Sequence, residues 1–190
     1  MILFINACVR EESRTKKLAD ELIKHLEGEV QEVKLSEVDF PNADGEFLKK
    51  RDALIAEEKW ADPMFDLGRQ FAAADTVVVA APYWDLSFPA ALKQYFEQIN
   101  VLGLTFKYTP EGTPDPLCRA DRLFYVMTAG GVFVPEEYGF GYVKTLAESF
   151  YGIKQVKLIK AVGLDIYGAD VDKIMDEAMQ GIETIVRNDG

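Results

Sequence analysis

Five short apolar segments alternate with segments of helical periodicity, and this alternation constrains the fold more than any other feature of the sequence. Thr76–Ala81, for example, is short, apolar and β-branched, as expected of a strand covered on both faces. The expected strands lie at Ile2–Asn6, Glu29–Leu35, Thr76–Ala81, Arg122–Thr128 and Gln155–Val162. The expected helices lie at Ser13–Leu26, Gly45–Glu58, Asp62–Ala74, Pro89–Asn100, Tyr142–Tyr151 and Asp170–Arg187. The pattern predicts an α/β fold with a doubly wound five-stranded parallel sheet, order 2-1-3-4-5, and helices on both faces.

Length and charge limit the organisation and the partners of the chain. With 190 residues and no linker-like stretch, we expect a single domain over residues 1–190. The net charge of −11 opposes binding to nucleic acid and to anionic membranes, so we expect neither as a partner. Any phosphate group must therefore be held locally by amides, hydroxyls and a few basic side chains.

Cysteine and histidine are scarce, which excludes several kinds of site. Cys8 and Cys118 are the two cysteines, too few for a disulfide scaffold, and the N-terminus lacks the pattern of a signal peptide. Both features predict a cytoplasmic protein. His25 is the one histidine, and its polar helical neighbours predict a surface position. We therefore expect no metal site and no nucleophile that depends on a histidine.

The loop Asn6–Thr15 follows the first strand and offers two interpretations. It lacks both the G-x-G-x-x-G dinucleotide pattern and the P-loop pattern. It supplies Arg10, Ser13, Arg14 and Thr15 beside the free amides of a helix start, where an anion such as a phosphate monoester would fit. Alternatively, Ser13 only caps the helix.

Two further loops follow strands that should end at the same edge of the sheet. Pro82–Leu86 carries two large aromatic rings, which either bracket a flat ligand or pack on a neighbouring helix. Thr128–Gly131 reads TAGG; paired glycines let a ring approach the backbone, although an ordinary turn has the same sequence. Together the three loops suit a mononucleotide that bears a planar ring.

The chain resembles the FMN-dependent NAD(P)H:quinone oxidoreductases and azoreductases of flavodoxin-like fold. The resemblance spans Met1 to about Val162, and its most specific part is the proline–aromatic stretch followed by S-F-P-A-x-L-K. The matching segments are ESRTKKLADEL (Glu12–Leu22), VVVAAPYWDLSFPAALKQYFEQI (Val77–Ile99), GLTFKYTPEG (Gly103–Gly112) and TAGG (Thr128–Gly131).

This resemblance implies a cofactor and a role for each loop. The FMN phosphate would be held by Arg10, Ser13, Arg14 and Thr15. The isoalloxazine ring would be lined by Pro82, Tyr83, Trp84, Asp85 and Leu86, and its pyrimidine end would meet Thr128, Gly130 and Gly131. Asp85 departs from the family pattern, in which asparagine is frequent. Phe133 and Val134 stand where many azoreductases have a histidine after the paired glycines.

The resemblance also implies ping-pong hydride transfer, in which NADH or NADPH reduces flavin N5 and a quinone, azo compound or similar small acceptor then takes the hydride. No catalytic side chain is required, because the flavin carries the chemistry. Phe106, Phe133 or Tyr138 would close the substrate pocket. Lys107 or Arg119 would meet the phosphates of the nicotinamide cofactor, unless both are solvated surface residues.

A homodimer is implied as well, with the site at its interface. The segments Phe40–Asp66 and Val101–Arg119 would build the interface, and the second of them predicts a long loop or a small hairpin. Its covered apolar residues would be Trp60, Phe65, Phe106 and Tyr108, unless these rings pack on their own core. The alternative function is a flavodoxin-type electron carrier. A phosphoacceptor domain is disfavoured, since Asn6 and Ala7 replace the acidic cluster it needs.

Overall fold

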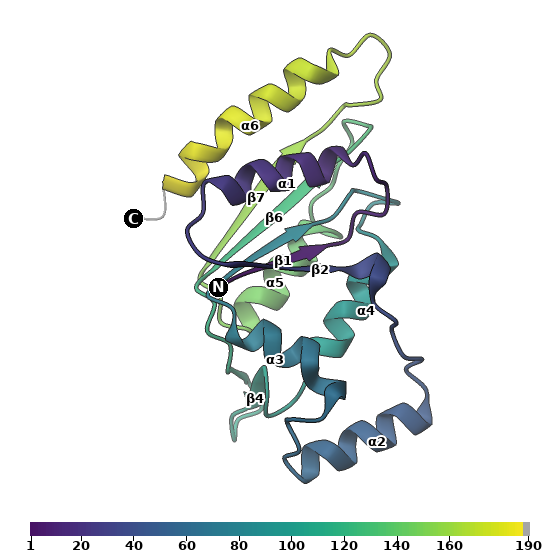
Figure 1. Cartoon of the computed structure of the whole chain (residues 1–190), viewed down its shortest axis with the longest axis vertical. Helices are drawn as coiled ribbons and strands as arrows, with labels where there is room; N and C mark the ends of the chain where they lie inside the picture. The colour runs from purple at the N-terminus through teal and green to yellow at the C-terminus, as the bar shows by residue number, and fades with distance from the viewer. Residues whose placement is uncertain (188–190) are drawn as a thin grey trace.

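The computed structural model describes residues 1–187, and its central feature is a five-stranded parallel sheet (Figure 1). Its strands are β1 (Ile2–Asn6), β2 (Val30–Lys34), β3 (Thr76–Ala80), β6 (Arg122–Thr128) and β7 (Gln155–Ala161). They lie in the order β2-β1-β3-β6-β7, and every neighbouring pair is parallel. The predicted fold class and strand order are confirmed. Residues 188–190 of the expected domain lie outside the described residues.

Burial along the strands follows their place in the sheet. All residues of β1 and β3 are buried, as the continuous apolar sequences predict for central strands covered on both faces. The edge strand β2 (VQEVK) buries only Val33, and three of its five residues are polar, as expected of an edge strand that is largely open to solvent.

Helices form a layer on each face of the sheet (Figure 1). One layer contains α1 (Arg14–Lys24) and α6 (Val171–Arg187), packed on each other and on the sheet. The other contains α3 (Asp66–Ala73), α4 (Ala90–Ile99) and α5 (Phe140–Ser149). His25 ends α1 with about a third of its side chain exposed, and its Nε2 lies 3.5 Å from Glu21 Oε1. Within residues 1–187, no helix is long and apolar enough to cross a membrane.

The first inserted segment lies at the lower end of the view in Figure 1, where α2 (Gly45–Ala56) stands away from the sheet. None of its residues is buried, whereas the helices that cover the sheet all bury apolar side chains. A short 3₁₀ helix, η1 (Leu35–Glu37), precedes this segment, and a second, η2 (Pro63–Phe65), follows α2. The single helix expected over Asp62–Ala74 is thus divided: Asp62 caps η2, Pro63 starts it, and α3 begins only at Asp66.

The second inserted segment forms the small hairpin that was one of its two predicted forms. β4 (Phe106–Tyr108) pairs antiparallel with β5 (Pro114–Pro116), near the amino ends of the sheet strands (Figure 1). The expectation that Phe65 and Phe106 meet a partner chain is wrong. Phe65 is fully buried in its own protomer, and the buried Phe106 ring packs 5.0 Å from that of Phe150. Trp60 packs on Phe65, while Tyr108 is exposed.

Candidate functional site

A cavity of about 360 Å³ opens at the carboxyl edge of the sheet. The loops that follow β1, β3, β6 and β7 all contribute to it, because parallel strands deliver their carboxyl ends to one edge. It is lined by these residues predicted from the sequence: Arg10, Ser13, Arg14, Thr15, Pro82, Tyr83, Trp84, Thr128 and Gly130. The structure therefore brings together the three loops that the sequence analysis singled out.

The loop after β1 is a set of unpaired backbone donors. Among the hydrogen bonds of residues 1–187, none has a backbone amide of residues 9–15 as its donor. The first turn of α1 explains part of this, since its amides have no carbonyl one turn earlier to bind. Of these residues only Ser13 and Thr15 are buried, so most of the amides are open to water or to a ligand, and the positive end of a helix favours an anionic ligand.

Hydroxyl groups fix the geometry of this loop. Ser13 accepts a hydrogen bond from the amide of Lys16 at 3.2 Å, so it caps α1 as one of the two interpretations predicted. A hydroxyl that accepts one hydrogen bond can also donate its own proton, so the cap does not exclude a role in anion binding. The Thr15 and Thr128 hydroxyls lie 2.6 Å apart and are buried, which ties the loop after β1 to the end of β6.

Of the basic side chains around the cavity, two form ion pairs among residues 1–187 and one does not. Arg14 Nη1 lies 2.8 Å from Asp165 Oδ1, and Lys17 Nζ lies 2.7 Å from Glu12 Oε2. Within the described part of the chain Arg10 forms no ion pair, so its guanidinium is available to a ligand. The opening thus combines an unpaired cation with unpaired amides, in a chain that is otherwise strongly acidic.

Hydrogen bonds fasten the loop after β3, and both of its aromatic residues, Tyr83 and Trp84, line the cavity. The amide of Tyr83 donates to Thr128 O at 3.0 Å and its hydroxyl donates to Pro135 O at 3.1 Å. Burial raises the pKa of Tyr83, so the phenol stays neutral and remains a hydrogen-bond donor. Trp84 follows with about two fifths of its side chain exposed, as a ring that is available to stack.

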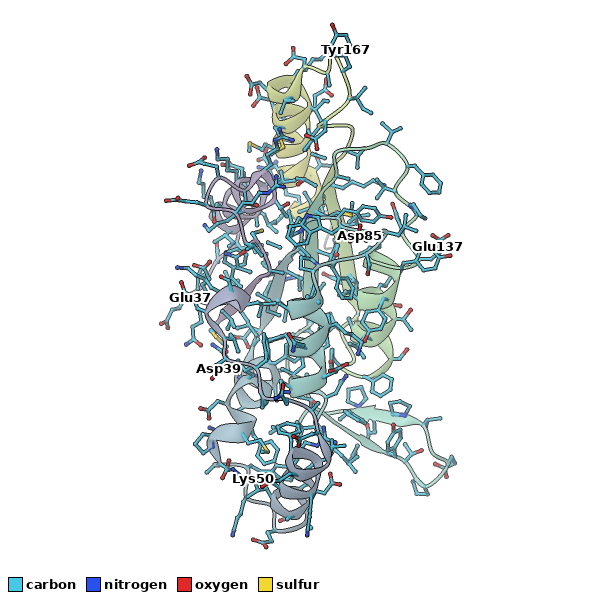
Figure 2. All side chains as sticks on the ribbon, turned by 90° about the vertical axis from the view of Figure 1, so that its right-hand side faces the viewer. Glu37, Asp39, Lys50, Asp85, Glu137 and Tyr167 are labelled. Atoms are coloured by element: carbon cyan, nitrogen blue, oxygen red, sulfur yellow. The ribbon has the colours of Figure 1, made fainter. Side chains whose placement is uncertain are left out.

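Asp85 and Leu86 form the centre of a tight turn beyond the cavity lining. Trp84 and Ser87 exchange backbone hydrogen bonds of 3.0 and 2.8 Å across them. Both central residues have positive φ, 50° and 68°, which is the geometry of a type I′ turn. Asp85 is exposed at the surface, on the same side of the molecule as Glu137 (Figure 2).

The TAGG segment presents its backbone. The amide of Ala129 pairs with Ala161 O, whereas those of Gly130 and Gly131 have no acceptor among residues 1–187. Gly131 lies outside the lining of the cavity, and so do the exposed rings of Phe133 and Tyr138. These exposed rings lie on the loop that follows TAGG, which Ser87 joins to the turn after β3 by donating to Tyr138 O at 2.7 Å.

Three other predicted residues lie apart from this edge. Phe106 is buried in the hairpin. Lys107 pairs with Asp115 at 3.3 Å and Arg119 with Asp75 at 2.6 Å, which agrees with the alternative that both are surface residues.

Sequence reasoning missed the fourth loop, which follows β7. Leu164 and Asp165 line the cavity together with Val9, Glu12 and Ala129. The available signal was position alone: a glycine and an aspartate follow the expected strand Gln155–Val162, and that strand ends at the same edge as the others. Tyr167, at the far end of this loop, is fully exposed (Figure 2).

The comparisons with known proteins agree with this architecture. Residues 1–186 match the family described as flavodoxin-like fold. An FMN-dependent NADH:quinone oxidoreductase of Clostridium beijerinckii is 34% identical over 98% of both chains, and one of Coprothermobacter proteolyticus is 33% identical over the same shares. Among solved structures, an azoreductase of Bacillus anthracis str. Sterne superposes with a TM-score of 0.83 over 98% of both chains at 24% identity. The chain therefore belongs to the flavodoxin-like fold family and, within it, to the FMN-dependent NADH:quinone oxidoreductases.

Proposed function

We propose that this protein binds FMN at the carboxyl edge of the sheet and uses NADH to reduce quinones or related small acceptors. The observation that carries the proposal is the convergence of unpaired donors on one cavity. The amides of residues 9–15 and of Gly130 lack acceptors among residues 1–187, and Arg10 stands beside the first group; the amide of Gly131, next to the lining, also lacks an acceptor there. A phosphate at one end of a ligand and polar ring atoms at its other end would satisfy both groups.

The phosphate end of the ligand belongs at the start of α1. The amides there donate in fixed directions, the hydroxyls of Ser13 and Thr15 lie among them, and Arg10 supplies a full charge. Charge-assisted hydrogen bonds are about twice as strong as neutral ones. Such a site can hold a dianion although the protein carries a net charge of −11.

The ring end belongs between the loops after β3 and β6. Pro82, Tyr83 and Trp84 line the cavity on the loop after β3, and the unpaired amide of Gly130 lies on the loop after β6, followed by that of Gly131 outside the lining. When bound, FMN supplies the hydride chemistry, and these residues position it and exclude water. No side-chain acid or base is assigned, because hydride transfer needs none.

The surroundings of the cavity favour flat, apolar acceptors. Trp84, Leu86, Val132, Phe133 and Tyr138 are exposed on the loops after β3 and β6. Aromatic side chains at an open rim stack on planar molecules, and quinones and azo compounds are planar. NADH is proposed as the reductant because the curated relatives carry it in their names.

We also propose that the protein is a homodimer in the cytoplasm. The helix α2 buries no residue, and a largely apolar hollow of about 630 Å³ lies between it and the body, lined in part by Phe40, Phe47, Met64 and Leu67. A helix that is uncovered in one protomer and borders an apolar hollow can be covered by a second copy of the chain. Free Cys8 and Cys118 suit a reducing compartment.

Anaerobic reduction of the FMN-loaded protein tests the function. NADH should bleach the visible absorbance of the bound flavin, and 1,4-benzoquinone should then restore it through repeated cycles. A flavodoxin-type carrier would be bleached by a protein partner but not directly by a nicotinamide. Absence of bleaching by both NADH and NADPH would contradict the proposal.

A further inference from the structure

One carboxylate touches two of the features assigned to the cofactor. Asp165 Oδ1 accepts a hydrogen bond from Arg14 Nη1 at 2.8 Å. Its other oxygen, Oδ2, lies against the Cα of Gly130, only 2.3 Å from the position that a Cβ would take there. Asp165 thus pairs with a cation assigned to the phosphate and covers part of the glycine surface assigned to the ring.

The backbone holds this carboxylate in place. The amide of Asp165 donates to Gly130 O at 3.0 Å, and that of Leu164 to Ala129 O at 3.2 Å. One residue earlier, Gly163 donates to Gly131 O at 2.9 Å and has a φ of +79°. The loop after β7 is therefore fastened along the TAGG segment, and the position of Asp165 is a consequence of that pairing.

We propose that Asp165 is a specificity-determining residue that competes with the phosphate of the flavin for Arg14. The proposal rests on the function proposed above. A dianion bound at the start of α1 must share or displace the guanidinium of Arg14, and it also meets the charge of Asp165 at close range. Riboflavin has no phosphate, so its binding neither displaces the guanidinium of Arg14 nor meets repulsion from Asp165. Asp165 consequently weakens the binding of FMN more than that of riboflavin, and so reduces the ratio by which the site prefers FMN.

The size of the effect follows from exposure. The side chains of Arg14 and Asp165 are 44% and 70% exposed, so their ion pair is screened by water. Exposed pairs contribute up to about 1 kcal/mol, which corresponds to about fivefold in an affinity. FMN still binds, because amides and Arg10 also hold its phosphate, but its affinity is lower than it would be without Asp165.

Equilibrium titration of the apoprotein with FMN and with riboflavin, followed by flavin fluorescence, tests this role. In Asp165→Asn the Kd for FMN should fall about fivefold, whereas that for riboflavin should change by less than about twofold. Asp172→Asn is the matched control, since it removes the same charge from an exposed position on α6 outside the cavity. It should leave both constants unchanged.

The Arg14→Ala background separates competition from simple repulsion. There the gain from Asp165→Asn should shrink, because the shared cation is gone; a gain of full size would overturn competition for Arg14. A weaker FMN complex in Asp165→Asn would also overturn the proposal, since it would make Asp165 a residue that positions Arg14 for the phosphate. An unchanged preference would overturn it while leaving the proposed function intact. Failure of the wild-type protein to bind either flavin would defeat both.

Discussion

The two edges of the parallel sheet differ in how completely their polar groups are paired. At the amino edge, Asp75 accepts from both the N-terminal ammonium and Arg119, and its carbonyl accepts from the amide of Asp121. At the carboxyl edge, the amides of residues 9–15 and the guanidinium of Arg10 lack partners within residues 1–187. The polar groups of the amino edge are thus used within the fold, while the carboxyl edge keeps donors that are open to water or to a ligand.

Removing donors from the carboxyl edge should have the largest effect. Ser13→Ala combined with Arg14→Ala should weaken FMN binding by at least about 100-fold, because hydrogen bonds to a charged group are worth about 1.5–3 kcal/mol each. The free energy of unfolding should fall by only about 1 kcal/mol, from loss of the α1 cap. Fluorescence titration and urea denaturation measure the two quantities. Unchanged FMN affinity would refute the assignment of the phosphate site.

Thr105, next to the hairpin, should show the opposite behaviour. Its buried hydroxyl donates to Ile99 O at 2.7 Å and accepts from the amide of Val101 at 3.2 Å. Thr105→Val should lower the free energy of unfolding by about 2 kcal/mol, because both partners lose a hydrogen bond inside the core. FMN affinity should stay within about twofold, as expected for distant sites. If binding changed as much as stability, the separation of the two edges would be wrong.

Two buried tyrosines of the core differ in whether their hydroxyl groups form a hydrogen bond, so their Phe variants can be compared directly. Tyr151 donates from its hydroxyl to Asn100 Oδ1 at 2.7 Å, whereas the hydroxyl of Tyr95 has no partner among the described residues. Tyr151→Phe should therefore cost about 1 kcal/mol of unfolding free energy, and Tyr95→Phe should cost nothing or stabilise slightly. Urea denaturation of both variants compares them directly. Equal losses would show that Tyr95 has a partner in solution.

The smallest expected effect concerns the strained turn at the carboxyl edge. Leu86 has a φ of 68°, a conformation that costs a branched side chain about 1–2 kcal/mol. Leu86→Gly should stabilise the protein by about 0.5 kcal/mol, since the greater entropy of glycine in the unfolded state offsets part of the relief. Thermal unfolding would detect it. Destabilisation beyond the glycine penalty would mean that the Leu86 side chain is held by packing that the structure does not contain.

Most of the fold follows from local sequence patterns. Apolar β-branched runs locate the strands, and the boundaries expected for Arg122–Thr128 agree with those of β6. The three predicted loops converge because parallel strands share one edge. The packing partners of single aromatic residues do not follow from such patterns. Phe65 and Phe106 lie in inserted segments, and nothing in the sequence distinguishes a ring that packs on its own core from one that meets a partner chain.

Asp165 illustrates the same limit for charges. An aspartate between Leu164 and Ile166 is an ordinary loop residue by composition. Its contacts with Arg14 and Gly130 arise only when the loop after β7 pairs with the TAGG segment. Long-range pairing of this kind leaves no periodicity in the sequence, so the contribution of the loop after β7 to the cavity could be identified only from the structure.

Amide chemical shifts during titration with FMN would test the convergence of donors most directly. In a ¹⁵N-labelled apoprotein, the largest changes should fall on the amides of residues 9–15 and on Gly130 and Gly131, while those of Thr105 and the β4–β5 hairpin should scarcely move. Largest changes around α2 and its apolar hollow, with the amides of residues 9–15 unaffected, would contradict the assignment of the site.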